Sequence, residues 1–384
     1  MGTERLVVVY GATGYTGELT CEDLTRRGIP FVAAGRNQER LQALVDRLRG
    51  EGADAEAIAI DHNEAELRRL LHGRKVCINI SGPYQVLGRD VVAASMAEAC
   101  HYIDVTGEQD FMLDMKREFG DVARDKELVL LVSNAFHWAP GACAAAIALE
   151  TEGIDTVEVV YKVFGRMTIA SAKSTFRVGK RPQFEIEDGE LRQIEYRKGH
   201  RMLVPPGESA TVPACPMGTA EIVWFVDDPR VRKMEVLRAD PASVGIAKSF
   251  VFMERLQKVV SRKRLDWLTD TLTDKLWKRP PPEDEEETRW TVWAEGRGSQ
   301  VTSRCVLRGS KPYVLTGHLG GEAAERILAG NILKTGFVGT HEAFGARSIM
   351  KSFEKCGATM TEPADDPPEI RTNGKAAARP AVGA

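Results

Sequence analysis

The sequence lacks a charge excess of either sign, a long apolar run and closely spaced cysteines. Its 384 residues include 52 Lys and Arg against 55 Asp and Glu, so no strong electrostatic field favours nucleic acid as a partner. No apolar stretch reaches the roughly 18 to 20 residues that span a bilayer, and this excludes a transmembrane segment. The seven cysteines are scattered and odd in number, a pattern that indicates free thiols in a reducing compartment.

Two common catalytic signatures are also missing. No His-Glu-x-x-His or paired Cys-x-x-Cys pattern supplies metal ligands at the usual spacing, so we predict no metal. No Gly-x-Ser-x-Gly turn is present, which disfavours a hydrolase. The N-terminal residues pass directly into a short apolar strand without the apolar region of a secretory signal, so we expect a cytoplasmic protein.

Short apolar runs alternate with helical patterns over the first 150 residues. The predicted strands are residues 6–10, 31–35, 55–61, 76–81, 102–106 and 128–133. Strands that alternate with helices form a parallel, doubly wound sheet. We therefore predict an α/β protein whose first domain covers residues 1–150.

The pattern changes after residue 150 to longer strands with alternating polarity, one pair joined by an Asp188-Gly189 turn. Helical patterns return over residues 322–352. We predict a second, α+β domain of largely antiparallel strands over residues 151–352, which binds substrate or forms a dimer and whose late helices could return to the first domain. The tail, 361–384, is rich in Pro, Ala, Asp and Gly, and we predict that it is disordered.

Residues 243–279 combine helical spacing with many bases and interleaved aromatic residues. The segment could be an amphipathic lid or a dock for a membrane or an acyl carrier. The favoured interpretation is a plain pair of helices with a solvated basic face.

A glycine-rich turn follows the first strand and opens the first helix. Gly11 allows a tight turn, Gly14 lets the backbone approach a pyrophosphate, and Gly17 lets the helix pack on the strand. The anion then lies at the positive end of the helix. We predict that a dinucleotide binds this turn, at Gly11, Thr13, Gly14, Tyr15, Thr16 and Gly17.

The second predicted strand ends in Arg36 and Asn37, where an NAD enzyme usually carries an acid for the ribose 2′-hydroxyl. Arg36, together with Arg40 one turn later, can form charge-assisted hydrogen bonds to a 2′-phosphate. These residues predict an NADP(H) site in a Rossmann domain. Asp61 could bind the adenine edge or cap the next helix.

Two further motifs follow, Ser81-Gly82-Pro83-Tyr84 and Tyr102-Ile103-Asp104-Val105-Thr106-Gly107-Glu108. With the two earlier motifs, the chain resembles the saccharopine dehydrogenase-like oxidoreductases, especially the branch of trans-acting enoyl reductases of bacterial lipid assembly. The resemblance covers roughly residues 5–150 and continues faintly to about 350. It implies that Ser81, Gly82 and Pro83 contact the nicotinamide ribose through their backbone, and that Asp104, Thr106 and Glu108 line the site.

The chain departs from these relatives after the next strand. Many of them carry a Gly-Phe-Asp-x-x-Pro-x-Asp pattern, whereas this chain reads Asn134-Ala135-Phe136-His137-Trp138-Ala139-Pro140-Gly141. His137 is the first candidate for a proton donor, because imidazole titrates near neutral pH; a structural histidine is the alternative. Glu108 is the second candidate, unless it caps a helix, and Tyr84 or Tyr313 could donate a phenolic hydrogen, unless they only pack.

The leading hypothesis is an NADP-dependent reductase of a C=C, C=N or C=O group in a small-molecule metabolite, for which the resemblance favours an enoyl or polyketide-type acyl substrate. The first alternative is saccharopine-type reductive amination. Its carboxylate pocket would use Arg166, Lys173, Arg177 and Lys180, unless these lie on the solvent face of a strand. The second alternative is a non-catalytic NADP-binding scaffold or regulator. A homodimer is expected from the frequency of such assemblies.

Overall fold

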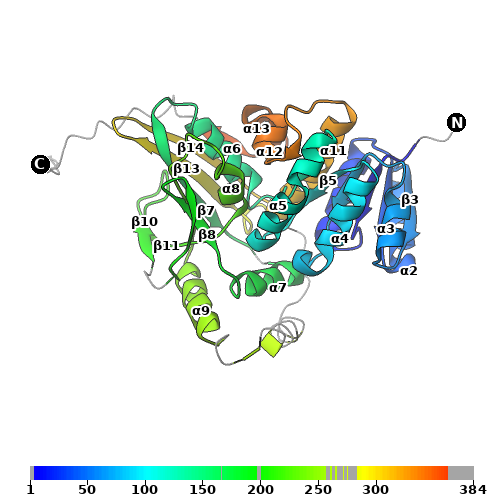
Figure 1. Cartoon of the computed structure of the whole chain (residues 1–384), viewed down its shortest axis with the longest axis horizontal. Coiled ribbons are helices and arrows are strands. Elements are labelled where there is room, and N and C mark those ends of the chain that lie inside the picture. The colour runs from blue at the N-terminus through cyan, green and yellow to red at the C-terminus, as the bar shows by residue number, and fades with distance from the viewer. Residues whose placement is uncertain are drawn as a thin grey trace, which may run out of the picture.

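The protein consists of two β-sheets with helices packed on them (Figure 1). This computed structural model describes residues 4–361 except residues 166, 197–199, 257–259, 262–263, 266–270, 272–274 and 276–282. Residues 362–384 of the predicted tail and much of the basic segment 243–279 lie outside the described residues.

The first sheet is parallel, in the strand order β15-β6-β5-β4-β1-β2-β3. Its strands are β1 (Val7–Tyr10), β2 (Phe31–Gly35), β3 (Ala55–Ala59), β4 (Val76–Asn79), β5 (His101–Asp104), β6 (Val129–Leu131) and β15 (Gly336–Phe337). The connecting helices are α1 (Tyr15–Arg26), α2 (Gln38–Gly50), α3 (Glu64–Leu71), α4 (Tyr84–Ala97) and α5 (Gln109–Asp125). This arrangement is the predicted Rossmann-like fold.

The position of the ligand crevice follows from this strand order. Every residue of β1 and β2 is buried, as expected for apolar strands covered by helices on both faces. The chain passes from β1 to β2 and β3 on one side and then crosses to β4 on the other. In open α/β sheets, ligands bind at the carboxyl ends of the strands where this reversal occurs. We therefore expect the ligand crevice at the carboxyl ends of β1 and β4.

The second sheet has the order β10-β11-β12-β7-β13-β14-β16, with β8 paired to β12 and β9 to β8. Among the described strand pairs, β12 with β7 is parallel and the others are antiparallel. The strands are β7 (Ile154–Val163), β8 (Phe184–Glu187), β9 (Glu190–Gln193), β10 (Arg201–Leu203), β11 (Val212–Pro216), β12 (Lys233–Ala239), β13 (Trp290–Gly298), β14 (Thr302–Gly309) and β16 (Thr359–Thr361). Its helices are α6 (Ala139–Ala148), α7 (Ile169–Val178), α8 (Ala220–Phe225) and α9 (Ser243–Leu256). The predicted α+β class of this half is confirmed.

Late segments of the chain return to the first sheet. β15 pairs with β6, and α11 (Pro312–Leu328) packs against α1. The short helices α12 (Thr340–Phe344) and α13 (Ala346–Glu354) follow. The first sheet thus draws on residues at both ends of the described chain.

One interpretation of the cationic residues was wrong. Lys173 and Arg177 lie on helix α7 rather than on the solvent face of a strand, and Lys180 follows the end of that helix. The Lys180 side chain is buried, with 3% of its surface exposed. Arg166 lies outside the described residues.

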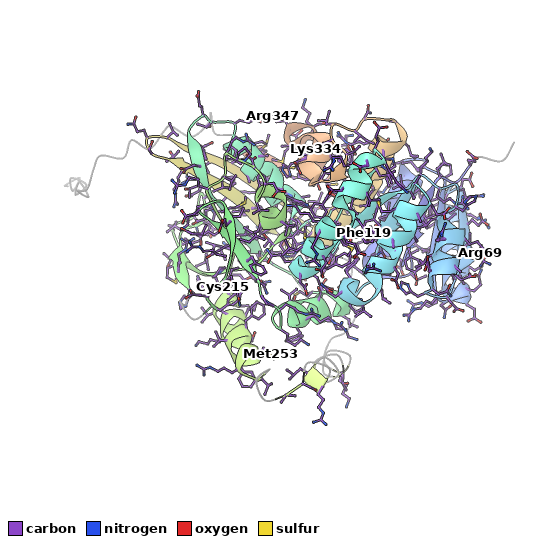
Figure 2. All side chains as sticks on the ribbon, in the orientation of Figure 1. Arg69, Phe119, Cys215, Met253, Lys334 and Arg347 are labelled. Atoms are coloured by element: carbon purple, nitrogen blue, oxygen red, sulfur yellow. The ribbon has the colours of Figure 1, made fainter. Side chains whose placement is uncertain are left out.

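Helix α9 is the described part of the basic segment. It extends beyond the second sheet at the lower edge of the molecule, where Met253 is labelled (Figures 1 and 2). Among the described residues, no helix is both long enough and apolar enough to cross a membrane.

Candidate functional site

The turn after β1 is shaped by two glycines that the protein itself requires. Gly11 has a φ of +87°, and a Cβ there would lie 2.9 Å from the backbone of Ile80 and Ser81. A Cβ at Gly17 would lie 2.4 Å from the carbonyl oxygen of Gly11. Both positions exclude a side chain because neighbouring backbone occupies the space.

Gly14 is different, because no protein atom requires it to be glycine. The nearest heavy atom to a Cβ at this position is the Gly11 carbonyl oxygen at 3.4 Å, an ordinary contact. Gly14 precedes α1, and no side chain caps that helix. An open position in front of a helix N-terminus fits a pyrophosphate that approaches the backbone.

Arg36 and Arg40 lie beside this turn. Arg36 is exposed just beyond the end of β2, and the Arg40 guanidinium donates to the carbonyl oxygen of Thr13 at 3.4 Å. Asn37 caps α2, since its side chain accepts from the backbone N–H of Arg40 at 2.9 Å. The two cations border the open turn, as the 2′-phosphate prediction requires.

Asp61 does not cap a helix. It is exposed after β3, and Asn63 caps α3 by accepting from the N–H of Glu66 at 3.0 Å. The capping interpretation of Asp61 is therefore wrong, and its contact with adenine stays a prediction.

Asp104 lies behind the crevice, with a fully buried carboxylate. One oxygen accepts from the backbone N–H groups of Thr106 and Ser133, at 3.0 and 2.8 Å, and the other accepts from Tyr102 Oη at 2.9 Å. Burial raises the pKa of Asp104 to about 7, against the lowering effect of these hydrogen bonds. Asp104 thus joins the ends of β5 and β6 from inside, instead of making the expected contact with the cofactor.

Thr106 and Ser81 have similar supporting roles. Thr106 is fully buried; its hydroxyl accepts from the N–H of Glu108 at 3.1 Å, and its carbonyl accepts from Ser133 Oγ at 2.8 Å. Ser81 Oγ donates to Asn79 Oδ1 at 2.6 Å. The Ser81-Gly82-Pro83 backbone nevertheless follows the carboxyl end of β4, and its contact with the nicotinamide ribose stays a prediction.

Glu108 and Tyr84 are bonded within the protein. The Glu108 carboxylate accepts from the backbone N–H groups of Tyr84 and Gln85, at 3.2 and 2.9 Å, and so caps α4. Burial raises the pKa of Glu108, although these hydrogen bonds act in the opposite direction. Tyr84 is buried and donates its hydroxyl hydrogen to the Asn79 carbonyl at 3.1 Å. The geometry therefore favours the capping and packing interpretations over the catalytic ones.

His137 lies in a cluster of aromatic rings beyond β6, which we call the aromatic wall: Phe136, His137, Trp138, Tyr161 and Trp290. Burial, with a smaller effect of Arg238, lowers the pKa of His137 to about 4. The imidazole is therefore neutral at pH 7. It cannot act as the imidazolium donor that was expected, but a neutral ring can still donate an N–H hydrogen bond to a carbonyl oxygen.

Two buried residues, Tyr161 in this wall and Glu221 beside it, were missed by the sequence reasoning. Tyr161 Oη lies 2.5 Å from Glu221 Oε1, and Gly141 N donates to the same hydroxyl at 3.1 Å. Burial raises the pKa of Glu221 to about 8. Neither residue belongs to a sequence motif. Their proximity depends on how α8 packs against β7 and α6, which the sequence alone does not reveal.

The N-terminal ends of α7 and α11, from the second half of the chain, meet beside the glycine turn. The Tyr313 ring makes an edge contact with Tyr15, with centroids 5.4 Å apart, and Tyr313 Oη accepts from the N–H of Thr168 at 2.9 Å. Just after the end of α7, Arg181 pairs with Asp110 at 2.9 Å. Tyr313 thus packs against the glycine turn, which fits its packing interpretation.

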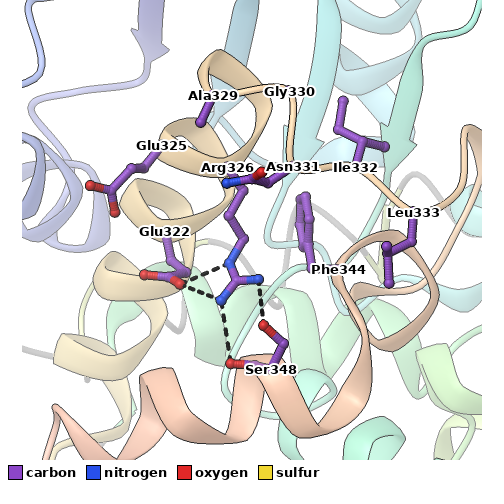
Figure 3. A pocket seen from close by; sticks show the side chains of 10 residues that line it. All are labelled: Glu322, Glu325, Arg326, Ala329, Gly330, Asn331, Ile332, Leu333, Phe344 and Ser348. Carbon is purple, nitrogen blue, oxygen red and sulfur yellow. Dashed lines mark hydrogen bonds and ion pairs between the residues drawn. The ribbon is translucent and has the colours of Figure 1, made fainter.

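A separate groove of about 650 Å³ lies at the far end of α11 (Figure 3). Arg326 crosses it and bonds both Glu322 and Ser348, while Phe344 and Leu333 form its apolar side. Because Tyr313 in the first turn of α11 lies beside the glycine turn, the rise of the helix from there to Glu322 separates this groove from the glycine turn by more than about 10 Å. The groove is not part of the candidate site. No group of three or more metal-ligating side chains occurs among the described residues.

The first two comparisons concern the N-terminal half. Residues 7–124 match the saccharopine dehydrogenase NADP binding domain. The saccharopine dehydrogenase-like oxidoreductases of Mus musculus and Homo sapiens are each 28% identical over 158 residues, which cover 36% of this chain. The match spans only 37% of the length of those relatives.

A solved structure extends the likeness over nearly the whole fold. The apo saccharopine dehydrogenase (L-Glu forming) from Saccharomyces cerevisiae matches with a TM-score of 0.61 and 12% identity, covering 93% of this chain and 100% of that one. At this identity the match shows the fold alone.

Fold, glycine turn and sequence matches together define the class of proteins that carry a saccharopine dehydrogenase-like NADP-binding domain. The predicted resemblance and the predicted NADP(H) cofactor are confirmed at this level. Within that class, the chain belongs to a family of unknown function (DUF5938), whose model matches residues 139–364.

Proposed function

We propose that the chain is an NADPH-dependent reductase of a C=C, C=N or C=O group in an apolar metabolite, with an enoyl or polyketide-type acyl substrate as the first choice. The aromatic wall carries this proposal, because it lies at the end of β6, beside the crevice. Hydride transfer is the chemistry of the nicotinamide, and the protein must orient the substrate and exclude water. A wall of rings does both for an apolar substrate.

The polar atoms of the aromatic wall support the same substrate class. Trp138 Nε1 donates to the Thr106 carbonyl at 2.9 Å, and Trp290 Nε1 donates to the Ser310 carbonyl at 3.0 Å. His137 makes no hydrogen bond to another described residue. The wall therefore offers apolar ring surface and one neutral N–H, which suits a single carbonyl oxygen on an otherwise apolar molecule.

One relative points in the same direction. The trans-acting enoyl reductase of Mycobacterium ulcerans is 34% identical over 108 residues, covering 27% of this chain and 26% of that protein. Its name supports testing enoyl substrates first.

The first experiment is a fluorescence titration with NADPH and NADH, in wild type and Arg36→Ala. A charge-assisted hydrogen bond contributes about 1.5–3 kcal/mol, so we expect Arg36→Ala to weaken NADPH binding about tenfold or more and to leave NADH unaffected. Arg117→Ala is the matched control, since Arg117 is an exposed arginine of α5 that pairs with Asp114. If wild type bound neither nucleotide, the proposal would fail at its first step. Once NADPH binding is established, the next experiment measures NADPH oxidation with enoyl, keto and imine compounds.

Reductive amination of the saccharopine type is the second candidate. The observation in its favour is that Arg177 of α7 and Arg181 just after it line a small cavity with Gln85, Glu108 and Asp110. Arg181 is already paired with Asp110, so a substrate carboxylate would have to displace a protein carboxylate. NADPH oxidation that requires both a keto acid and an amino acid would favour this candidate over the first.

A non-catalytic NADP-binding role near lipid is the third candidate, together with the predicted peripheral membrane contact through 243–279. In support, Phe252 of α9 is 61% exposed beside the exposed Lys248. The lipid droplet localized protein of Caenorhabditis elegans is 30% identical over 141 residues. NADPH binding without turnover, combined with sedimentation on anionic vesicles that Phe252→Ser abolishes, would favour this role.

A further inference from the structure

A buried polar pair beside the aromatic wall is not used by the chemistry proposed above. Glu221 on α8 has none of its surface exposed, and Tyr161 on β7 has 1%. Their oxygens lie 2.5 Å apart. Burying a carboxyl group without a positive partner costs folding free energy, so we expect a role that offsets this cost.

The sequence at the start of α6 is fitted to this pair. Gly141 lies in the first turn of α6 and donates its N–H to Tyr161 Oη at 3.1 Å. A Cβ at position 141 would lie 2.2 Å from Tyr161 Oη and 2.4 Å from Glu221 Oε1. Only glycine allows the three elements α6, β7 and α8 to meet at this hydroxyl.

Glu221 is held as a neutral acid at this meeting point. Burial raises its pKa to about 8, and no ion pair is formed by Glu221 among the described residues. Its second oxygen, Oε2, is buried without a hydrogen-bond partner in the described part of the chain. A neutral carboxyl group can both donate and accept, so it can fix the phenol without introducing a net charge next to an apolar site.

Because its hydroxyl is held in place, the ring of Tyr161 also restrains its neighbours in the aromatic wall. It lies nearly parallel to His137, at 23° with centroids 6.0 Å apart, and meets Trp138 edge-on at 6.1 Å. The hydroxyl is anchored on the side of α6 and α8, whereas the ring contacts His137. Any rotation of the phenol therefore changes the surface against which His137 is held.

We propose that Glu221 is a positioning residue for His137 and acts through Tyr161. The pair fixes the tyrosine ring, the ring fixes the imidazole, and the imidazole is then oriented toward the substrate carbonyl. This inference rests on the proposed reductase function for its consequence in catalysis. The positioning of His137 itself does not depend on that function.

The test compares Glu221→Gln, Glu221→Ala and Tyr161→Phe with wild type. Tyr196→Phe is the matched control, because Tyr196 is a half-buried tyrosine whose hydroxyl donates to Gln183 at 2.7 Å and whose ring packs on Phe250. NADPH affinity, measured by fluorescence, should stay within about twofold of wild type in all four variants, because none touches the glycine turn.

The first readout is independent of activity and follows the His137 ring signals and their titration by NMR. We expect Glu221→Ala and Tyr161→Phe to move the His137 signals and to raise its titration midpoint by about one pH unit as water reaches the ring. Glu221→Gln and Tyr196→Phe should leave both unchanged. Unchanged His137 signals in folded Tyr161→Phe would overturn the proposal, even if no substrate were ever found.

The second readout applies once a substrate is turned over. Loss of orientation should lower kcat about tenfold or more in Glu221→Ala and Tyr161→Phe with little change in KM, and Glu221→Gln should restore it. A folded Glu221→Gln variant with the same loss as Glu221→Ala would contradict positioning, since it would show that the carboxyl proton itself is needed. Failure to find any turnover would count against the proposed function, while the NMR result would still decide the positioning.

Discussion

At the scale of single residues, Gly14 is the sharpest indicator of a bound dinucleotide. A Cβ there would meet only the Gly11 carbonyl oxygen, at 3.4 Å, so the fold should accept alanine with a change in stability within about 0.5 kcal/mol. A pyrophosphate bound against the same backbone would collide with the added methyl group. We expect Gly14→Ala to weaken NADPH binding about tenfold or more at nearly unchanged thermal stability.

Two other glycines provide the controls for this prediction. Gly50 at the end of α2 has nothing within 4 Å of a Cβ, so Gly50→Ala should alter neither binding nor stability. Gly17→Ala should lose stability, because its Cβ would lie 2.4 Å from a carbonyl oxygen. Wild-type NADPH affinity in Gly14→Ala would mean that no ligand approaches the backbone at this turn.

At the scale of elements, Glu108 connects two neighbouring helices. It precedes α5, and its carboxylate caps α4 through the N–H groups of Tyr84 and Gln85. Glu108→Ala would leave these donors unpaired at a cost of about 1–3 kcal/mol each. We expect a lower unfolding midpoint in denaturant for Glu108→Ala and an intermediate value for Glu108→Gln, which keeps one carbonyl acceptor.

A catalytic role for Glu108 predicts another pattern. Glu108→Gln would then abolish turnover while the midpoint stayed near that of wild type. Glu118→Gln is a suitable control on the same helix, because Glu118 makes an exposed pair with Arg89. Measuring turnover and the unfolding midpoint in Glu108→Ala, Glu108→Gln and Glu118→Gln separates a capping role from a catalytic one.

The elements that the sequence predicts well are those with local causes. The glycine turn, the β/α alternation and the Asp188-Gly189 turn, whose residues have φ of 54° and 80°, depend on steric rules within a few residues. The role of Glu108, the buried position of Asp104 and the Tyr161–Glu221 pair depend on which segments pack together. Glu221 is 60 residues from Tyr161 in the chain, and no spacing rule relates them.

At the scale of the whole molecule, a buried ionic cluster joins the helix of the glycine turn to a late helix. His318 on α11 contacts Asp23 Oδ1 on α1 at 3.2 Å and Ser352 Oγ on α13 at 2.7 Å. Asp23 also accepts from Arg27 at 2.6 Å. Burial alone would lower the pKa of His318, but the hydrogen bonds to Asp23 and Cys356 raise it to about 9. We therefore expect the docking of α11 on α1 to depend on pH.

The direction of this dependence follows from proton linkage. A histidine whose pKa is about 6.5 when unfolded and higher when folded stabilises the fold fully below pH 6.5, and this contribution is lost as pH rises through the folded value of about 9. We expect His318→Gln to cost on the order of 2–3 kcal/mol of unfolding free energy at pH 6 and progressively less toward pH 9. Urea unfolding of both proteins at pH 6, 7.5 and 9 measures the difference. His72→Gln should show only a small difference, because the His72 side chain is 83% exposed beside Glu98. A His318→Gln penalty that stayed constant from pH 6 to 9 would mean that His318 is neutral in the folded protein and that α11 is held on α1 by packing alone.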